Sequence, residues 1–200
     1  MAVEREAWNG PRVERVSVHD RTAELRLSTF LSRHLRALLS PEGVPLVICI
    51  GTDRSTGDSL GPLVGTFLSE KLPGLPVFGT LEYPVHAGNL VEVLERVKGK
   101  YSAGVAIAID ACLGRNESVG SITAGVGPLK PGAGVNKDLP SVGSLYITGT
   151  VNVGGFMEYL VLQNTRLNLV MKMAQVVTRA INEALLQLNL PASSVGGSTS

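Results

Sequence analysis

Short apolar runs that alternate with helical patterns constrain the fold of this chain of 200 residues more than any other feature. The run VPLVICI (44–50) is nearly continuous and rich in β-branched residues, which is typical of a strand buried on both faces of a parallel sheet. The run GVAIAID (104–110) has the same character. Because helical patterns separate such runs, the sequence predicts a three-layer α/β/α sandwich around a mostly parallel sheet.

The same patterns place the other elements. Helices are predicted over 22–40, 58–72, 89–100 and 166–188, and strands over 44–50, 75–81, 104–110, 120–126 and 144–151. The face of the first helix that packs on the sheet is predicted to carry Leu25, Phe30, Leu31, Leu35 and Leu38.

One domain is expected over residues 1–200, with a polar N-terminal segment to about residue 20 and a flexible tail from about 191. Charged residues make up 18% of the chain and the formal net charge is +1. This balance argues against nucleic-acid and membrane-surface partners, which need a clustered charge of one sign. Partners are therefore sought in pockets.

The N-terminus lacks the apolar core of a secretory signal, and no segment is long and apolar enough to span a bilayer. The two cysteines, Cys49 and Cys112, have neither zinc-type spacing nor the density of a disulfide framework. These features predict a cytoplasmic protein in a reducing compartment.

Two aspartates follow the predicted buried strands. Asp58 lies in the glycine-rich turn GTDRSTGDSLGP (51–62), and Asp110 closes the run 104–110. Because ligands of open α/β sheets bind beyond the carboxyl ends of the strands, the two carboxylates are expected to converge at one edge.

Two familiar motifs fail at these positions. For a phosphate-binding loop, the spacing from Gly51 puts Thr56 where the second glycine should be, and Asp58 rather than a lysine follows Gly57. VGSLY around Ser144 lacks the second glycine of a nucleophile elbow. A phosphate site and a serine triad are therefore not supported.

A pair of nearby carboxylates has a different chemical use. Because like charges resist joint ionisation, one carboxyl keeps its proton and donates to a carbonyl oxygen, while the other takes a proton from water. This is the acid–base pair of amide hydrolysis. The structural alternative is that Asp58 caps its helix and Asp110 caps or brackets a loop.

Three segments resemble the spore germination protease family: TGDSLGP (56–62), AIAIDACLGR (106–115) and LKPGAGVNKDL (129–139). The resemblance extends from about Leu46 to the long C-terminal helix. It implies a phosphorylase/hydrolase-like fold shared with hydrogenase maturation peptidases, in a protein of the forespore or spore core. The implied activity is that of an atypical aspartic endopeptidase, with Asp58 and Asp110 as the catalytic pair.

The resemblance also implies partners and supporting residues. The implied substrates are proteins or peptides, small acid-soluble spore proteins in particular, and a homo-oligomer remains open. Arg115 matches an arginine just beyond the family's second aspartate, where its charge would lower a carboxyl pKa or stabilise an oxyanion. No cofactor is expected.

Departures from the family keep alternatives open. The chain is shorter, and TGTVNVGGFMEY (148–159), which contains the candidate supporting residue Asn152, replaces the family's Val-Pro-Thr stretch. A catalytically silent sporulation protein with a binding or regulatory role therefore stays open. So does a metal-assisted amidohydrolase, although no metal ligand is assigned because no histidine follows His86.

Other polar residues near the predicted sheet edge have weaker assignments. His86 either orients substrate and transfers a proton or satisfies a turn. Asp53 is predicted to support its loop as an Asx-turn residue, and Cys112 to be a small buried hydrophobe. A rim for an extended peptide is predicted in the long loop, from Gly132, Gly134, Asn136 and Lys137.

Overall fold

The computed structural model describes residues 11–131 and 139–188, and in this part of the chain one sheet of six strands lies between helices. The strands are β1 (Val13–Ser17), β2 (Pro45–Cys49), β3 (Val77–Phe78), β4 (Val105–Gly114), β5 (Ser121–Val126) and β6 (Leu145–Val153). The α-helices are α1 (Ala23–Leu38), α2 (Leu60–Lys71), α3 (Leu90–Lys100), α4 (Glu158–Gln163) and α5 (Leu167–Gln187). Two short 3₁₀-helices are η1 (Gly57–Ser59) and η2 (Asn116–Ser118).

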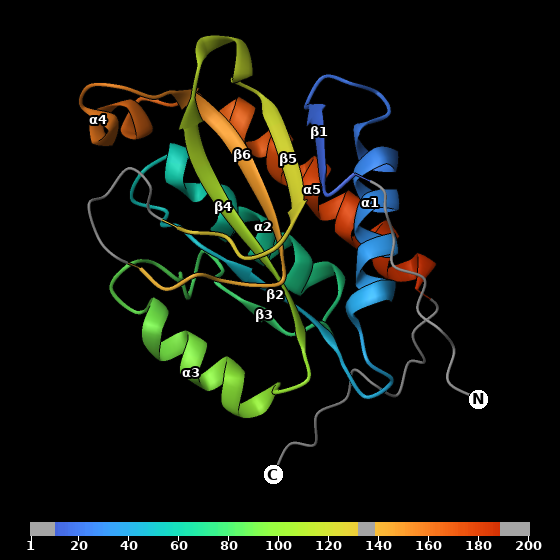
Figure 1. The fold of residues 1–200 in the computed structure, drawn as a ribbon. Coiled ribbons are helices and arrows are strands. Elements are labelled where there is room, and N and C mark those ends of the chain that lie inside the picture. The colour runs from blue at the N-terminus through green and yellow to red at the C-terminus, as the bar shows by residue number, and fades with distance from the viewer. Residues whose placement is uncertain (1–10, 132–138, 189–200) are drawn as a thin grey trace.

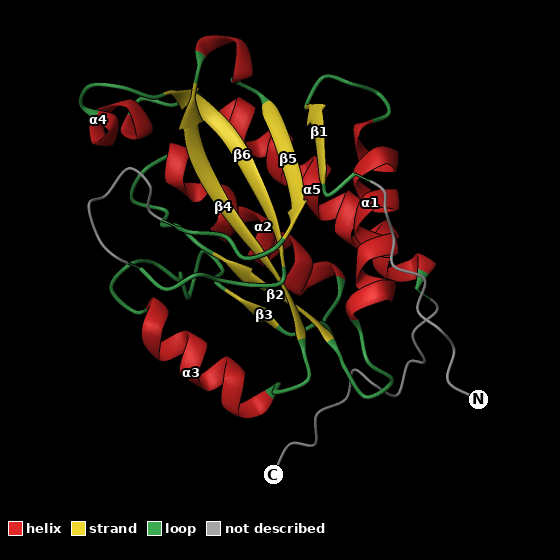
Figure 2. Cartoon of the chain, viewed as in Figure 1, coloured by secondary structure: helices red, strands yellow, loops and turns green. Residues whose placement is uncertain are grey.

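The strands follow the order β1-β5-β6-β4-β2-β3 across the sheet (Figure 2). β3, β2, β4 and β6 pair in parallel, whereas β5 is antiparallel to both β6 and β1. Only β5 therefore runs against the other strands of the described sheet. The prediction of a mostly parallel sheet is confirmed.

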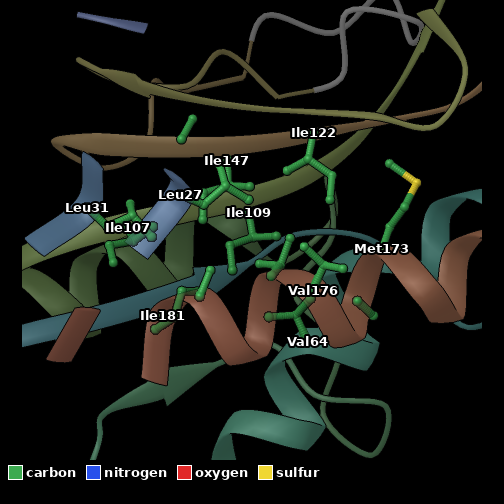
Figure 3. Close-up of a cluster of buried hydrophobic side chains, with 14 of the residues drawn as sticks. Leu27, Leu31, Val64, Ile107, Ile109, Ile122, Ile147, Met173, Val176 and Ile181 are labelled. Carbon is green, nitrogen blue, oxygen red and sulfur yellow. The ribbon is translucent and has the colours of Figure 1, made fainter. Parts of the chain in front are cut away.

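Helices cover both faces of the sheet. α1, α2 and α5 lie on one face, and α3 lies on the other (Figure 1). Successive β4 residues show this division, because Ile107 and Ile109 join the core under α1, α2 and α5, whereas Ala108 joins the core under α3. Figure 3 shows the larger core, in which Ile107 and Ile109 pack among side chains of the helices. The predicted three-layer architecture is confirmed.

The inward face of α1 differs from the predicted one. Phe30, Leu31 and Leu35 are buried as expected, but Leu25 is 64% exposed. Leu38, at the last residue of the helix, is exposed as well. Leu27 is fully buried instead, because it lies one helical turn before Leu31 and shares its face.

The predicted polar N-terminal segment contributes β1 to the sheet. No strand was predicted there. Arg26 of α1 fixes this edge strand. Its guanidinium forms ion pairs with Glu14 and with Asp20, and donates to the backbone oxygen of Arg15. The strand escaped prediction because Val16 is its only buried residue.

Two further observations complete the fold. α4 was not predicted either, since none of its six residues is buried and its apolar residues show no helical period.

Within 11–131 and 139–188, no helix combines the length and apolar character needed to cross a membrane. Residues 1–10, the predicted tail 191–200, and the rim residues Gly132, Gly134, Asn136 and Lys137 lie outside the described residues.

Candidate active site

Close backbone contacts shape the turn after β2. Gly51 has a φ of +138°, and a Cβ there would lie 2.0 Å from the backbone oxygen of Asp58. The Thr52 N–H donates to that same oxygen at 3.2 Å. A Cβ at Gly61 would lie 2.1 Å from the Ile50 oxygen. Glycine therefore allows the turn and the start of α2 to fold back onto the end of β2.

Asp58 lies inside η1 and is not the N-cap of α2. That position belongs to Ser59, whose side chain makes no capping hydrogen bond. Burial raises the pKa of Asp58 to about 6, against a smaller opposing effect of the Thr52 backbone. The carboxyl is consequently half protonated near pH 6. A group with such a pKa can donate or accept a proton under mildly acidic conditions.

The sequence predicts that Asp110 ends its strand, but in the structure Asp110 lies within β4. β4 continues to Gly114, because its pairing with β6 extends beyond the last residue of β2. The Ile50 N–H still donates to the Ile109 oxygen at 2.7 Å, so Asp110 lies at the level where β2 stops. Asp110 is 8% exposed, so its carboxyl is buried within a strand of the sheet.

The segments that carry the two aspartates meet at this edge of the sheet. Residues of η1 approach β4 with Cα–Cα separations of 8 Å or less. β2 and β4 are adjacent parallel strands, so the turn after β2 begins beside Asp110. The two segments that carry the aspartates therefore lie next to each other, and a β4–β6 bulge between Cys112 and Leu113 lies close by.

A row of polar residues on the sheet face of Asp110 was not foreseen. Backbone register aligns Asp110 with Thr148, Thr148 with Thr123, and Thr123 with Arg15. These residues point away from the face covered by α1, α2 and α5, because their strand neighbours fill that core. The signal that could have revealed part of this row is the alternation of polar and apolar residues in the segment 145–152.

Cys112 shares the face of Asp110. Its Sγ lies 3.5 Å from the Thr150 hydroxyl, and burial raises the pKa of the thiol, with a further increase from the charge of Asp110. A thiol that resists ionisation is a poor nucleophile. Cys112 was predicted to be a small buried hydrophobe, and in the structure it is only partly buried.

His86 lies at the same edge, because the preceding residue, Val85, forms a bridge with Ile50. The ring Nδ1 of His86 accepts a hydrogen bond from the Gly88 backbone N–H at 3.1 Å. The backbone N–H of His86 donates to Asn89 Oδ1 at 2.8 Å. These contacts build the turn that leads into α3. They support the structural interpretation of His86.

Arg115 and Asp53 are exposed. Arg115 follows the last residue of β4, five residues beyond Asp110 and on the far side of the bulge between Cys112 and Leu113. In the loop of Asp53, the Arg54 N–H donates to the Thr52 hydroxyl, so Thr52 makes the turn contact that was predicted for Asp53.

Asn152 connects β6 to the segment before α5. Its amide donates to the Val161 oxygen and to the Thr165 hydroxyl, each at 3.2 Å, and its Oδ1 accepts from the Val153 N–H. Thr165 in turn lies against Gly57, at the start of η1. Asn152 therefore supports the position of η1 through these contacts.

Histidine, cysteine and carboxylate side chains are the usual protein ligands of metal ions. In the described part of the chain, no three of them come close enough together to hold a metal ion.

A comparison with known families matches residues 15–180 to the family described as "Protein of unknown function (DUF1256)". The chain belongs to this family. The matched range of DUF1256 begins in β1, ends within α5, and includes both Asp58 and Asp110.

A curated relative is similar over most of the chain. The protein named "Uncharacterized protein YyaC", from Bacillus subtilis (strain 168), is 55% identical over 169 residues, which are 84% of this chain and 81% of the relative.

Proposed function

We propose that this DUF1256 protein is an atypical aspartic endopeptidase that hydrolyses peptide bonds of a small protein with Asp58 and Asp110. The observation that carries the proposal is the meeting of η1, which holds Asp58 with its raised pKa, and β4, which holds the buried Asp110, at one edge of the sheet. The motifs TGDSLGP and AIAIDACLGR, which resemble those of spore germination proteases, support the same pair.

In this proposal, Asp58 is the acid and Asp110 is the base. Asp110 takes a proton from a water molecule, whose oxygen attacks the carbonyl carbon of the peptide bond, while Asp58 donates its proton to the carbonyl oxygen. In the second step a proton passes from the carboxyl of Asp110 to the leaving nitrogen, the C–N bond breaks, and Asp58 recovers its proton from a hydroxyl of the tetrahedral intermediate, which becomes the carbonyl of the new carboxyl group. Both carboxyls then return to their initial states, and one water molecule has been consumed.

The resemblance supplies the biological setting. Small acid-soluble spore proteins are the proposed substrates, in the cytoplasm of the forespore or in the spore core, on a fold of the hydrogenase maturation peptidase type. The polar row formed by Arg15, Thr123 and Thr148 offers hydrogen-bonding groups to a peptide that lies across the sheet face toward Asp110.

The test is incubation of the purified protein with small acid-soluble spore proteins, followed by mass spectrometry of the products. Wild type is compared with Asp58→Asn, Asp110→Asn and the matched control Asp53→Asn, which changes an exposed aspartate of the same loop. Cleavage by wild type and the control alone is expected.

Three results would contradict the proposal. Cleavage by either active-site variant would remove that aspartate from the mechanism. Activity that disappears on chelation and returns with a divalent cation would indicate a metal-assisted amidohydrolase. Stable binding of the spore proteins without cleavage, by all four folded proteins, would indicate a catalytically silent binding or regulatory partner.

A further inference from the structure

An exposed apolar surface lies at the end of β6 and on α4. We call it the α4 patch; its members are Val153, Phe156, Met157, Tyr159 and Leu160. Phe156 is 89% exposed and Tyr159 is 69% exposed. Figure 1 shows α4 at the margin of the molecule, beyond the end of the sheet. Exposed apolar clusters of this kind mark interaction sites more often than isolated apolar residues do.

The backbone at the centre of the α4 patch is strained. Met157 has a φ of +56° and a ψ of +45°, the left-handed conformation that glycine adopts without penalty. Its side chain is nevertheless 55% exposed and contributes little to the core of the monomer. Because strained residues concentrate at functional positions, a methionine here is better explained by contacts outside the monomer than by its own fold.

The polar groups next to the α4 patch already have partners within the chain. The Tyr159 hydroxyl accepts from Gln163 Nε2 at 2.9 Å, and Asn164 Nδ2 donates to the Leu160 oxygen at 2.8 Å. Glu158 is the only charged residue of α4, and it is partly exposed. An occupant of the patch therefore needs mainly apolar surface.

The extent of the α4 patch matches one half of a dimer interface. Taking a fully exposed aromatic side chain as about 150–250 Å², the five residues expose roughly 500–600 Å². A stable interface buries about 800 Å² on each partner, and in homodimers about 65% of this area is apolar. The apolar share of such an interface is roughly 500 Å² per chain.

From these observations we infer that the α4 patch is the interface of a symmetric homodimer, in which the patch of one copy packs against the same patch of a second copy. Self-pairing satisfies the requirement for a mainly apolar partner, because the second copy brings the same surface. Since η1 contacts α4, the interface also borders the turn that carries Asp58.

The test is sedimentation equilibrium of the full chain over a wide range of concentration. Wild type is expected to change from monomer to dimer. Phe156→Ala is expected to weaken association about thirtyfold for each copy of the residue, and about a thousandfold in the dimer, because a symmetric interface contains the residue twice. Leu25→Ala is the control, since it removes an apolar side chain that is 64% exposed on α1.

Met157→Gly separates an interface role from a folding role. It relieves the left-handed strain, so the thermal midpoint of the monomer is expected to stay constant or rise, while association weakens at least tenfold. Wild type that stays monomeric at every concentration would overturn the inference and leave the patch to a different protein. A dimer that persists in Phe156→Ala, or weakens equally in Leu25→Ala, would overturn it as well.

Discussion

Asp58→Asn is expected to stabilise the protein at neutral pH, because it replaces a carboxylate that burial disfavours with a neutral group of the same shape. Burial raises the pKa of Asp58 from its ordinary value of 3.8 to about 6. Between these values the folded protein binds more protons than the unfolded chain, so this group makes the folded state less stable as the pH rises. At about 1.36 kcal/mol per pKa unit, its full cost above pH 6 is about 3 kcal/mol.

The difference in free energy of unfolding between Asp58→Asn and wild type should therefore depend on pH. It is expected to be near zero below the ordinary pKa, where both side chains are neutral, and to reach about 3 kcal/mol above pH 6. In a protein of this size, that corresponds to an increase of roughly 6–12 °C in the thermal midpoint. Urea unfolding at a series of pH values, followed by circular dichroism, measures the difference.

Asp53→Asn is the matched control, because it removes the charge of an exposed aspartate from the same loop and should leave the unfolding free energy nearly unchanged at every pH. A constant difference between Asp58→Asn and wild type across the pH range would refute the reasoning. Lower stability of Asp58→Asn at pH 8 would refute it more strongly. Either result would mean that the folded protein compensates the Asp58 charge, and would also remove the basis for its role as the acid.

Three further predictions follow from the site and the core. Because Asp58 must be protonated to act as the acid, kcat/KM for peptide hydrolysis should fall as the pH rises above about 6; a rate that increases through this range would reverse the two roles. Asn152→Ala should lower the free energy of unfolding by about 1–3 kcal/mol and speed amide hydrogen exchange in α4, because the Val161 oxygen and the Thr165 hydroxyl lose a donor; unchanged exchange would contradict this. Leu27→Ala should cost about 2–5 kcal/mol in urea unfolding, whereas Leu25→Ala should change little, and equal effects would contradict the assigned face of α1.

The local sequence was sufficient for the buried strands and long helices. The apolar runs at 44–50 and 104–110 predicted β2 and the first part of β4, and α5 was predicted within one residue at each end. Such elements are predictable because their apolar residues repeat with the period of the backbone. β1 and α4 lack this signal, since each buries at most one side chain.

The candidate site was only partly accessible from sequence. The motifs pointed to Asp58 and Asp110. The contact of Asn152 with Thr165 could not be predicted, because it depends on the path of the chain from β6 through α4. Arg115 lies close to Asp110 in the motif, but it is exposed after the last residue of β4, whereas Asp110 is buried within the strand. Sequence separation does not measure distance until the length of the strand is known.

The sequence by itself determined the class of fold and pointed to Asp58 and Asp110 as candidate site residues, because periodic apolar residues and short motifs are local properties. Only the tertiary structure decided how far β4 extends beyond β2, and therefore that Asp110 lies within a strand beside the turn of Asp58. It also decided the raised pKa of Asp58 and the exposure of the α4 patch. Burial depends on segments that are distant in the sequence, so these properties arise only when the chain packs.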